Sequence, residues 1–365
     1  MSIAAATMAA LVRTMMRIRA FENAAEQASQ GGVSAYGKSA DGTARVRGPL
    51  HLSTGQEAVP AGVCAHLGLE DYLTSTHRGH GHTLAKGADL TRMMCELFGK
   101  AAGFNGGKGG SMHIADFSVG MLGANGVVAA GLPIAVGAAH AQKLLRAVPG
   151  RSQAAWSPPG GGDGVPTPGG CMARAGITAC FFGDGAINRG PFLEALNWAQ
   201  VYCLPVLFVC EDNRWSATTA SAPMIAGEGA SARAESFGIP ATKVDGNDVL
   251  AVHEAAGRLV AQVRADQGPR LLHAITYRVK GHVSVDPAAY RDAAELEAAL
   301  KTDPIARARG QYLALPGASA GELARIEREA QEEVLAAMAA ADAAEWPQPE
   351  AAFTDVQTTG AGIWR

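Results

Sequence analysis

Two short apolar runs with a helical pattern between them are the clearest structural signal in the chain. The runs are ITACFF (177–182) and PVLFVC (205–210), and both are almost continuously hydrophobic. Between them, Phe192, Leu196 and Ala199 recur on one helix face, and Pro191 suits the first turn of that helix. Strands without polar alternation are typical of a parallel sheet covered on both faces. The pattern therefore predicts a strand–helix–strand unit of an α/β fold with helices on both faces of the sheet.

Further segments extend this α/β pattern along the chain. Glycine is so frequent between 99 and 131 that we expect no regular structure there. The stretch 293–344 is rich in Ala, Glu and Arg and predicts helix. A further strand is predicted at 270–279. Apolar periodicity predicts other helices that begin near Met8 and end before Gly31, or that cover residues 56–67, 90–98, 132–145 and 247–265.

One large α/β domain is predicted over residues 1–345, followed by a C-terminal tail at 346–365. The tail contains two prolines and no apolar period. Residues 33–48 are polar and contain glycine, which predicts a surface loop. Residues 147–170 are rich in proline and glycine, which predicts a mobile loop inserted into the domain.

Composition narrows the classes of function. The net charge is -3, so there is no basic surface for nucleic acid. No run of about 18 apolar residues predicts a membrane span. Six cysteines form no C-x-x-C pair, so neither a structural zinc site nor a disulfide framework is favoured. The N-terminus lacks the basic start and long apolar centre of a signal peptide, and we expect a cytoplasmic protein.

Polar residues follow both strands of the central unit. Asp184, within Gly183-Asp184-Gly185, follows the first strand, and Asn213, within the sequence EDN, follows the second. Because the carboxyl ends of parallel strands meet at one edge of a sheet, we expect Asp184 and Asn213 to lie close together. A carboxylate and an amide oxygen suit Mg²⁺, and the N-terminus of the next helix favours an anion. GDG alone is usually a tight turn, but GDG with the later acid–amide cluster is a more specific signal.

The stretch GDGAINRGPFLEALNWAQVYCLPVLFVCEDN resembles the thiamine diphosphate motif, in which GDG is followed by Asn after a gap of under thirty residues. Further motifs occur in the order of one family: HLSTGQEAVPAGVCAHL, TSTHRGHGHTLAKG, GGKGGSMHIAD, GMLGANGVVAAGLPIAVGAA and YRVKGHVSVDPAAYR. Over residues 8–350 the chain resembles the α subunit of the thiamine-diphosphate-dependent decarboxylating component of 2-oxo acid and acetoin dehydrogenase complexes. The resemblance implies a parallel-sheet thiamine-diphosphate-binding fold.

The resemblance also implies a set of cofactor and metal ligands. The side chains of Asp184 and Asn213 and the carbonyl of Trp215 would bind Mg²⁺, which holds the cofactor diphosphate. Val128 would be the apolar wedge below the bent cofactor. His282 and His77 are the candidate catalytic residues. The implied cofactor-binding residues are His77, Arg78, Gly126, Val128, Gly183, Asp184, Gly185, Ala186, Asn213 and His282.

The sequence THRGHGH admits another interpretation, because His77, His80 and His82 could be metal ligands. We favour anion binding by Arg78, since a guanidinium fork suits phosphate oxygens, and we leave His80 and His82 unassigned. The segment GFNGGKGGSMH does not complete a phosphate-binding P-loop, because its glycine spacing and hydroxyl residue are missing. Its Ser111 and His113 are better interpreted as active-site or subunit-contact positions.

A glutamate that activates the aminopyrimidine of the cofactor is missing from the motifs of this chain. In the resembled family this glutamate comes from a β subunit, so the resemblance implies an α2β2 heterotetramer with the cofactor at an α/β interface. The small-residue helix at 132–145 would be a packing surface for such a partner. The acyl- or hydroxyethyl-thiamine intermediate would then pass its acyl unit to a lipoyl-bearing acyltransferase.

The substrate stays open. STHRGHGH, GGSMHIAD and MLGANG look more like acetoin dehydrogenase chains, whereas EDNRWSATT and YRVKGHVSVDPAAYR depart from that pattern. Acetoin, pyruvate and branched-chain 2-oxo acids are therefore all candidates. Two other functions are alternatives: a Mg²⁺-dependent phosphate-transfer protein that uses Asp184, and a non-catalytic interaction subunit with a degenerate site. The first would need a phosphate loop, and the second predicts loss of the pair Asp184 and Asn213.

Overall fold

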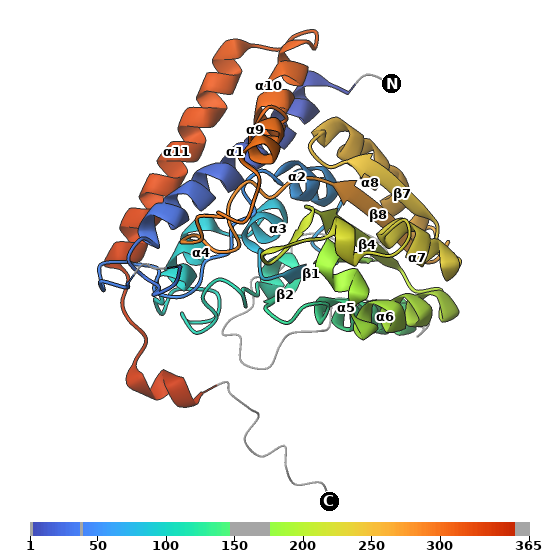
Figure 1. The fold of residues 1–365 in the computed structure, drawn as a ribbon, viewed down its shortest axis with the longest axis horizontal. Helices are drawn as coiled ribbons and strands as arrows, with labels where there is room; N and C mark the ends of the chain where they lie inside the picture. Colours follow the sequence, from blue (N-terminus) through green and yellow to red (C-terminus); the bar gives the residue numbers. More distant parts are fainter. Residues whose placement is uncertain (1–2, 37–38, 147–175, 355–365) are drawn as a thin grey trace, which may run out of the picture.

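A six-stranded parallel sheet forms the centre of the protein in the computed structural model, which describes residues 3–36, 39–146 and 176–354 (Figure 1). The strand order is β2-β1-β3-β4-β8-β7, and every neighbouring pair is parallel. This sheet confirms the predicted α/β class. The strands are β1 Tyr72–Thr76, β2 Met121–Asn125, β3 Thr178–Gly183, β4 Val206–Asp212, β7 Ala241–Asp245 and β8 Arg270–Ile275.

The two central strands are apolar throughout because their side chains fill two separate cores. Along β3, Phe181 belongs to one core, whereas the next residue, Phe182, belongs to the other. Leu207 and Phe208 divide between the two cores in the same way along β4. Since successive side chains of a strand point to opposite faces, a strand buried on both faces loses its polar alternation. The continuous apolar runs in the sequence therefore correspond to the middle of the covered sheet.

Helices cover both faces of the sheet. The smaller core lies under α5 Gly131–Arg146, α6 Gly190–Val201 and α7 Ala230–Ser236. Figure 1 shows α5 and α6 together below the sheet, with α2 and α8 on the other side of the sheet. The larger core is made with α1 Ala5–Ala28, α2 Ala58–Cys64, α3 His80–Ala85, α4 Leu90–Leu97 and α8 Val249–Arg264, together with two helices near the C-terminus.

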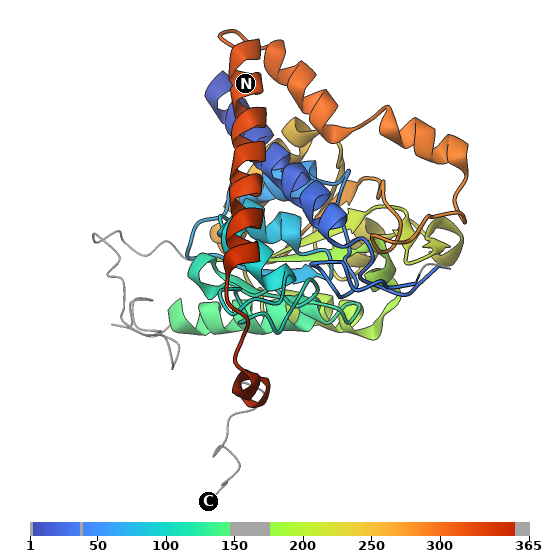
Figure 2. The same ribbon diagram turned by 90° about the vertical axis from the view of Figure 1, so that its left-hand side faces the viewer.

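Helix α1 packs along α11 Ala320–Ala343, although the two lie at opposite ends of the described chain (Figures 1 and 2). Arg17 on α1 forms a two-pronged ion pair with Glu333 on α11, with N–O distances of 2.7 and 2.6 Å. The first and the last α-helix of the described chain are thereby held together. Within the described residues, no helix has the length and apolar character needed to cross a membrane.

The secondary structure differs from the predicted one in several places. Strand β2 lies inside the glycine-rich stretch 99–131, and strands β1 and β7 were not predicted. The stretch 293–344 is not one helix but three, namely α9 Ala293–Leu300, α10 Pro304–Leu313 and α11. Helix α9 ends at Leu300, and a new helix then begins where Asp303 caps the start of α10 and Pro304 fills its first position. The start of the predicted tail contains a short 3₁₀ helix at Pro349–Phe353.

The two predicted insertions have different outcomes. The described part of the stretch 33–48 contains no helix or named strand, which agrees with a loop. It does not lie wholly on the surface, because Val46 is buried in the larger core. The predicted loop at 147–170 and the end of the tail lie outside the described residues.

Candidate active site

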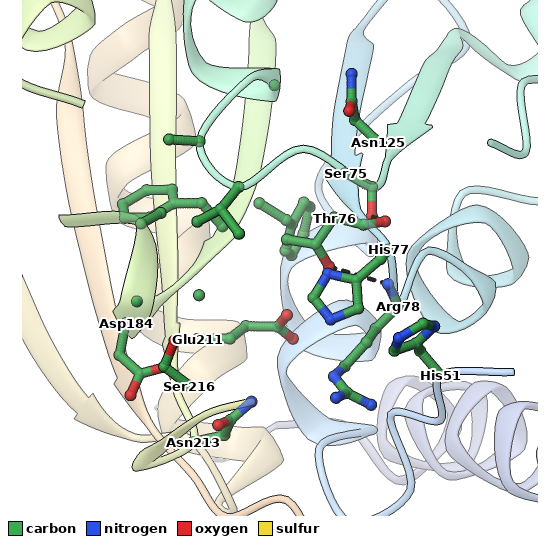
Figure 3. Close-up of a pocket in the computed structure, with 18 of the residues that line it drawn as sticks. His51, Ser75, Thr76, His77, Arg78, Asn125, Asp184, Glu211, Asn213 and Ser216 are labelled. Atoms are coloured by element: carbon green, nitrogen blue, oxygen red, sulfur yellow. Dashed lines mark hydrogen bonds between the residues drawn. The ribbon is translucent and has the colours of Figure 1, made fainter. Parts of the chain in front are cut away.

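One cavity at the carboxyl edge of the sheet is lined by every residue that the sequence predicts for cofactor and metal binding. The lining comes from the segments that follow β1, β2, β3, β4 and β8, together with the turn before α2. In Figure 3, Asp184 and Asn213 lie on one side, His51, His77 and Arg78 lie on the other, and Glu211 points between them. The structure therefore brings the separate sequence motifs together at the edge where open parallel sheets bind ligands.

Asp184 is a nearly buried carboxylate, with 2 % of its surface exposed. Strands β3 and β4 pair with Gly183 opposite Glu211, so the ends of the two strands are level. Burial, reinforced by the negative charge of Asp212, raises the pKa of Asp184 to about 6, although the hydrogen bond from the Ser221 hydroxyl opposes this rise. A cation bound beside such a desolvated carboxylate would strongly stabilise its ionised form.

Asn213 and Trp215 are held by a tight hairpin that follows β4. Strands β5 Trp215–Ser216 and β6 Thr219–Ala220 form this hairpin, and Arg214 (φ 68°) makes the turn into it. The backbone N–H of Trp215 donates to Oδ1 of Asn213 at 3.1 Å. The Trp215 carbonyl accepts a long hydrogen bond, 3.5 Å, from Arg278. Asn213 and Trp215 thus line the same cavity as Asp184.

Three imidazoles from distant segments meet at the other side of the cavity. The ring centroids of His51 lie 4.7 Å from His77 and 4.8 Å from His282. Burial and the charge of Arg78 lower the pKa values of His51, His77 and His282 to about 3, 2 and 4, respectively. All three rings are therefore neutral at physiological pH and present N–H donors without adding charge.

The three imidazoles have ligand atoms within 4.8 Å of one another, which is a spacing that a metal ion could close. Arg78, however, donates to Nδ1 of His282 at 3.3 Å and to its carbonyl at 3.0 Å. A guanidinium in direct contact opposes a second cation at this place. The local charge therefore favours an anion over a metal at the imidazoles.

The three histidines of THRGHGH do not share one site. His80 is buried between Glu22 (3.3 Å) and Ser111 (3.1 Å), and His82 lies between Ser75 (2.7 Å) and Glu211 (3.1 Å). Only His77 lines the cavity. The residues predicted as active-site or subunit contacts, Ser111 and His113, are not among the lining residues either.

A network of arginines gives the cavity its positive charge. Burial and the neighbouring Arg278 lower the pKa of Arg78 to about 9, and burial and Arg291 lower that of Arg278 to about 10, so both remain charged at neutral pH. The guanidinium of Arg278 donates to the Ala217 carbonyl at 2.7 Å, and Arg291 lies 5.1 Å from the ring centre of Trp215. These contacts join the loop after β8 to the hairpin after β4.

His282 has a fixed place within the loop after β8. Its backbone N–H donates to a carboxylate oxygen of Asp286 at 2.7 Å, and the hydroxyl of Tyr290 donates to the same oxygen at 2.7 Å. Tyr290 in turn accepts from Arg278 at 3.4 Å. The loop is therefore shaped by its own side chains.

Among the lining residues that were not predicted from the sequence, four are polar side chains with an unsatisfied atom, namely His51, Gln56, Glu211 and Arg278. The motifs HLSTGQE, EDN and YRVKGH contain them, but nothing in the local spacing distinguishes them from their neighbours. All four carry a buried side-chain atom without a hydrogen-bond partner in the described protein, as does His77. Buried polar atoms normally have partners, so these atoms indicate a polar ligand in this cavity.

The residues present fit thiamine diphosphate and a metal ion. Buried donors and two charged arginines suit a diphosphate, whereas the carboxylate, amide and carbonyl oxygens after β3 and β4 suit Mg²⁺. Val128 and Leu132 provide apolar surface for an aromatic ring system. Val128 is 47 % exposed and the neighbouring Val127 is 67 % exposed, so this apolar rim faces outward.

Comparisons with known proteins agree with this fit. The model of the dehydrogenase E1 component family matches residues 40–350. The α subunit of acetoin:2,6-dichlorophenolindophenol oxidoreductase from Bacillus subtilis (strain 168) is 37 % identical over 346 residues, which cover 95 % of this chain and 92 % of that protein. The α subunit of the same name from Cupriavidus necator is 42 % identical over 316 residues, covering 86 % and 87 %. The pyruvate dehydrogenase E1 component subunit alpha of Porphyra purpurea is 40 % identical over 280 residues, covering 77 % and 76 %.

These matches span most of the chain and include every motif that lines the cavity. They favour the enzyme over the two alternatives, a phosphate-transfer protein and a non-catalytic interaction subunit. The chain belongs to the dehydrogenase E1 component family, and it is a thiamine-dependent dehydrogenase subunit of the class that its motifs predict.

Proposed function

We propose that the chain is the α subunit of a thiamine-diphosphate-dependent dehydrogenase that acts on acetoin or on a 2-oxo acid such as pyruvate. The observation that carries this proposal is the convergence of the GDG, EDN, THR, GANGV and KGH motifs on one basic cavity at the carboxyl edge of the sheet. The relatives named for acetoin and for pyruvate are similarly close to this chain. Acetoin and 2-oxo acids are therefore both proposed as candidate substrates.

The metal is proposed to be Mg²⁺, held by the side chains of Asp184 and Asn213 and by the carbonyl of Trp215. All three residues line the cavity, and the buried carboxylate of Asp184 would supply the charge that a hard cation requires. Gly183, Gly185 and Ala186 would bring the backbone close to the diphosphate at the start of the helical turn after β3.

The basic side of the cavity would hold the anionic end of the cofactor. Arg78 and His282 provide a guanidinium and an N–H donor, and His77 carries a buried Nε2 without a partner in the described protein. When bound, thiamine diphosphate supplies a carbon nucleophile and an electron sink for breaking the bond beside the substrate carbonyl. Gly126 and Val128 would support its pyrimidine side, and His77 and His282 would act at the reacting end as neutral donors.

The partner is proposed to be a β subunit in an α2β2 assembly, and it would supply the glutamate that activates the aminopyrimidine. Besides the exposed valines at the cavity rim, a group of large apolar side chains is exposed on α5 and α6. Exposed apolar groups of this extent indicate a covered surface in the assembled protein. The group consists of Ile134, Leu144, Leu193, Trp198 and Val201. A lipoyl-bearing acyltransferase would accept the acyl unit from the assembled enzyme.

Calorimetric titration of thiamine diphosphate with Mg²⁺ tests this function directly. The expected result is tight, Mg²⁺-dependent binding when the chain is assembled with its β subunit and loss of binding in Asp184→Ala. Asp342→Ala on α11, whose side chain is 46 % exposed, is the matched control and should bind normally. Failure of the assembled wild type to bind would refute the proposal. Oxidation of acetoin, pyruvate or 3-methyl-2-oxobutanoate, followed with a dye as electron acceptor, would then separate the substrates.

A further inference from the structure

Gln56 is a buried residue whose amide oxygen has a hydrogen-bond partner, whereas its amide nitrogen has none in the described protein. It lies in the turn before α2, is 1 % exposed and lines the cavity. Its Oε1 accepts a hydrogen bond from Nδ2 of Asn213 at 3.0 Å. Its Nε2 is buried and has no hydrogen-bond partner in the described part of the protein. A buried amide nitrogen is costly to leave unpaired, so the site calls for an acceptor atom beside it.

The turn that carries Gln56 is held by close packing and by hydrogen bonds of the residues before it. Gly55 has φ +94°, and a Cβ at this position would meet Cγ2 of Val279 at 2.5 Å. The preceding Thr54 donates to the buried carboxylate of Glu22 at 3.0 Å. The backbone N–H of Gly55 donates to Glu57. These contacts fix the backbone at Gln56 and direct its side chain into the cavity.

The Oε1 of Gln56, together with the N–H of Trp215, sets the orientation of the Asn213 amide. Because Nδ2 of Asn213 donates to Gln56, its Oδ1 must lie on the opposite side, where it accepts from the N–H of Trp215. An amide can rotate by half a turn at little steric cost, so only hydrogen bonds distinguish its oxygen from its nitrogen. Without an acceptor at Gln56, only the N–H of Trp215 would hold the Asn213 oxygen in this orientation, and the nitrogen of an amide is not a metal ligand.

We infer that Gln56 anchors the cofactor: its Nε2 donates to an oxygen of the diphosphate, and its Oε1 holds Asn213 with the amide oxygen toward the metal. This inference rests on the proposed function. The diphosphate is the chosen acceptor because Gln56 touches Asn213, at the metal end of the cavity, rather than Val128 at the apolar end. Gln56 is thus both a binding residue and a positioning residue for a metal ligand.

The test is the affinity of the assembled α2β2 protein for inorganic diphosphate with Mg²⁺, followed by calorimetry. Gln56→Glu keeps the size of the side chain and an acceptor for Asn213 but replaces the donor with a negatively charged oxygen. We expect affinity to fall on the order of tenfold to a hundredfold, the range for one hydrogen bond to a charged group. Gln56→Met removes both functions without adding charge, and it should also raise the Mg²⁺ concentration needed for binding. Gln331→Glu on the exposed face of α11 is the control for the added charge.

The outcomes separate this inference from the proposed function. If the wild type binds neither diphosphate nor thiamine diphosphate, the proposed function fails. If the wild type binds and Gln56→Glu binds equally well, Gln56 is only a structural residue and the inference is overturned. Thermal midpoints are measured for all variants. Should Gln56→Glu fail to assemble, Gln56→Met decides the matter, since wild-type affinity in that variant overturns the inference and a tenfold loss supports it.

Discussion

Arg78 and His282, 204 positions apart in the chain, are joined by two hydrogen bonds from one guanidinium nitrogen, to Nδ1 at 3.3 Å and to the main-chain carbonyl at 3.0 Å. Arg78 follows β1 and His282 follows β8, and two strands of the sheet lie between them. The contact therefore joins two distant segments of the chain on the basic side of the cavity. Arg78 also donates to the Leu52 carbonyl at 2.6 Å. One side chain thus supplies positive charge and positions a neighbouring imidazole.

Replacing Arg78 by lysine tests both functions at once. Lysine keeps the charge but lacks the planar fork, so it cannot reach the carbonyls of Leu52 and His282 together. We expect the affinity of the assembled enzyme for thiamine diphosphate to fall by roughly tenfold to a hundredfold, as measured by calorimetry. Arg258→Lys on the exposed side of α8 is the control. If Arg78→Lys bound thiamine diphosphate with wild-type affinity, a positive charge alone would be enough for binding and the planar fork would not be needed.

Asp184 should reduce stability in the metal-free protein while it enables metal binding. Burial and the charge of Asp212 raise its pKa from 3.8 to about 6, so the folded state binds the proton more tightly than the unfolded state. Stability of the metal-free protein therefore falls as the pH rises through this window, by about 1–3 kcal/mol. Asp184→Asn removes that cost and still accepts a hydrogen bond from Ser221.

The expected result for Asp184→Asn is a higher thermal midpoint than the wild type at pH 8 without metal and a much smaller difference near pH 4. Mg²⁺-dependent cofactor binding should be lost at both pH values. Scanning calorimetry with a chelator, and again with Mg²⁺, measures both effects. A midpoint at pH 8 below that of the wild type would contradict the assigned direction of the pKa shift.

Glu22 is a buried carboxylate that organises the turn before Gln56. It accepts from the backbone N–H of Ser53 at 2.8 Å, from the hydroxyl of Thr54 at 3.0 Å and from His80 at 3.3 Å. Burial opposes its ionisation, but the hydrogen bonds from His80 and Ser53 outweigh burial and lower its pKa. Glu22→Gln should reduce the free energy of unfolding by roughly 2–4 kcal/mol, because an amide has only one acceptor oxygen.

Urea unfolding at several pH values measures the effect of Glu22→Gln. A lowered pKa stabilises the fold above the ordinary value of 4.5, and this stabilisation disappears as the pH falls through the folded-state pKa. The difference from the wild type should therefore shrink in acid. Glu254→Gln, at a side chain 79 % exposed, should change stability by less than about 0.5 kcal/mol. Equal stability of Glu22→Gln and the wild type at pH 7 would contradict the role assigned to Glu22.

Val128 should matter for turnover and little for stability. It is 47 % exposed in the chain, so truncation leaves no core cavity. If it supports the bent cofactor, Val128→Ala should lower kcat by roughly tenfold to a hundredfold through misplacement of the reacting atoms. Thermal midpoint and cofactor affinity should stay close to the wild type. Leu335→Ala, at an exposed position on α11, is the control. An unchanged kcat in Val128→Ala would contradict the proposal that Val128 supports the bent cofactor.

The sequence by itself determined the central unit of the fold and the metal end of the candidate site. Strands β3 and β4 were predictable because both of their faces are buried, which leaves a continuous apolar run. Asp184 and Asn213 were predictable because parallel strands must end at the same edge. The order of the motifs was enough to predict the family, and the family comparison confirms it.

Only the tertiary structure decided which other side chains face the cavity. Strands β1, β2 and β7 were missed because they are short, and β2 and β7 lie at the edges of the sheet, where burial leaves a weak pattern. His51, His77 and His282 meet because three distant segments come together at one edge of the sheet. The spacing of residues along the chain does not predict this contact. Side-chain direction, strand order and the turn at Gly55 depend on long-range packing. For that reason the partners of Gln56, unlike the candidate metal ligands, could not be predicted from neighbouring residues.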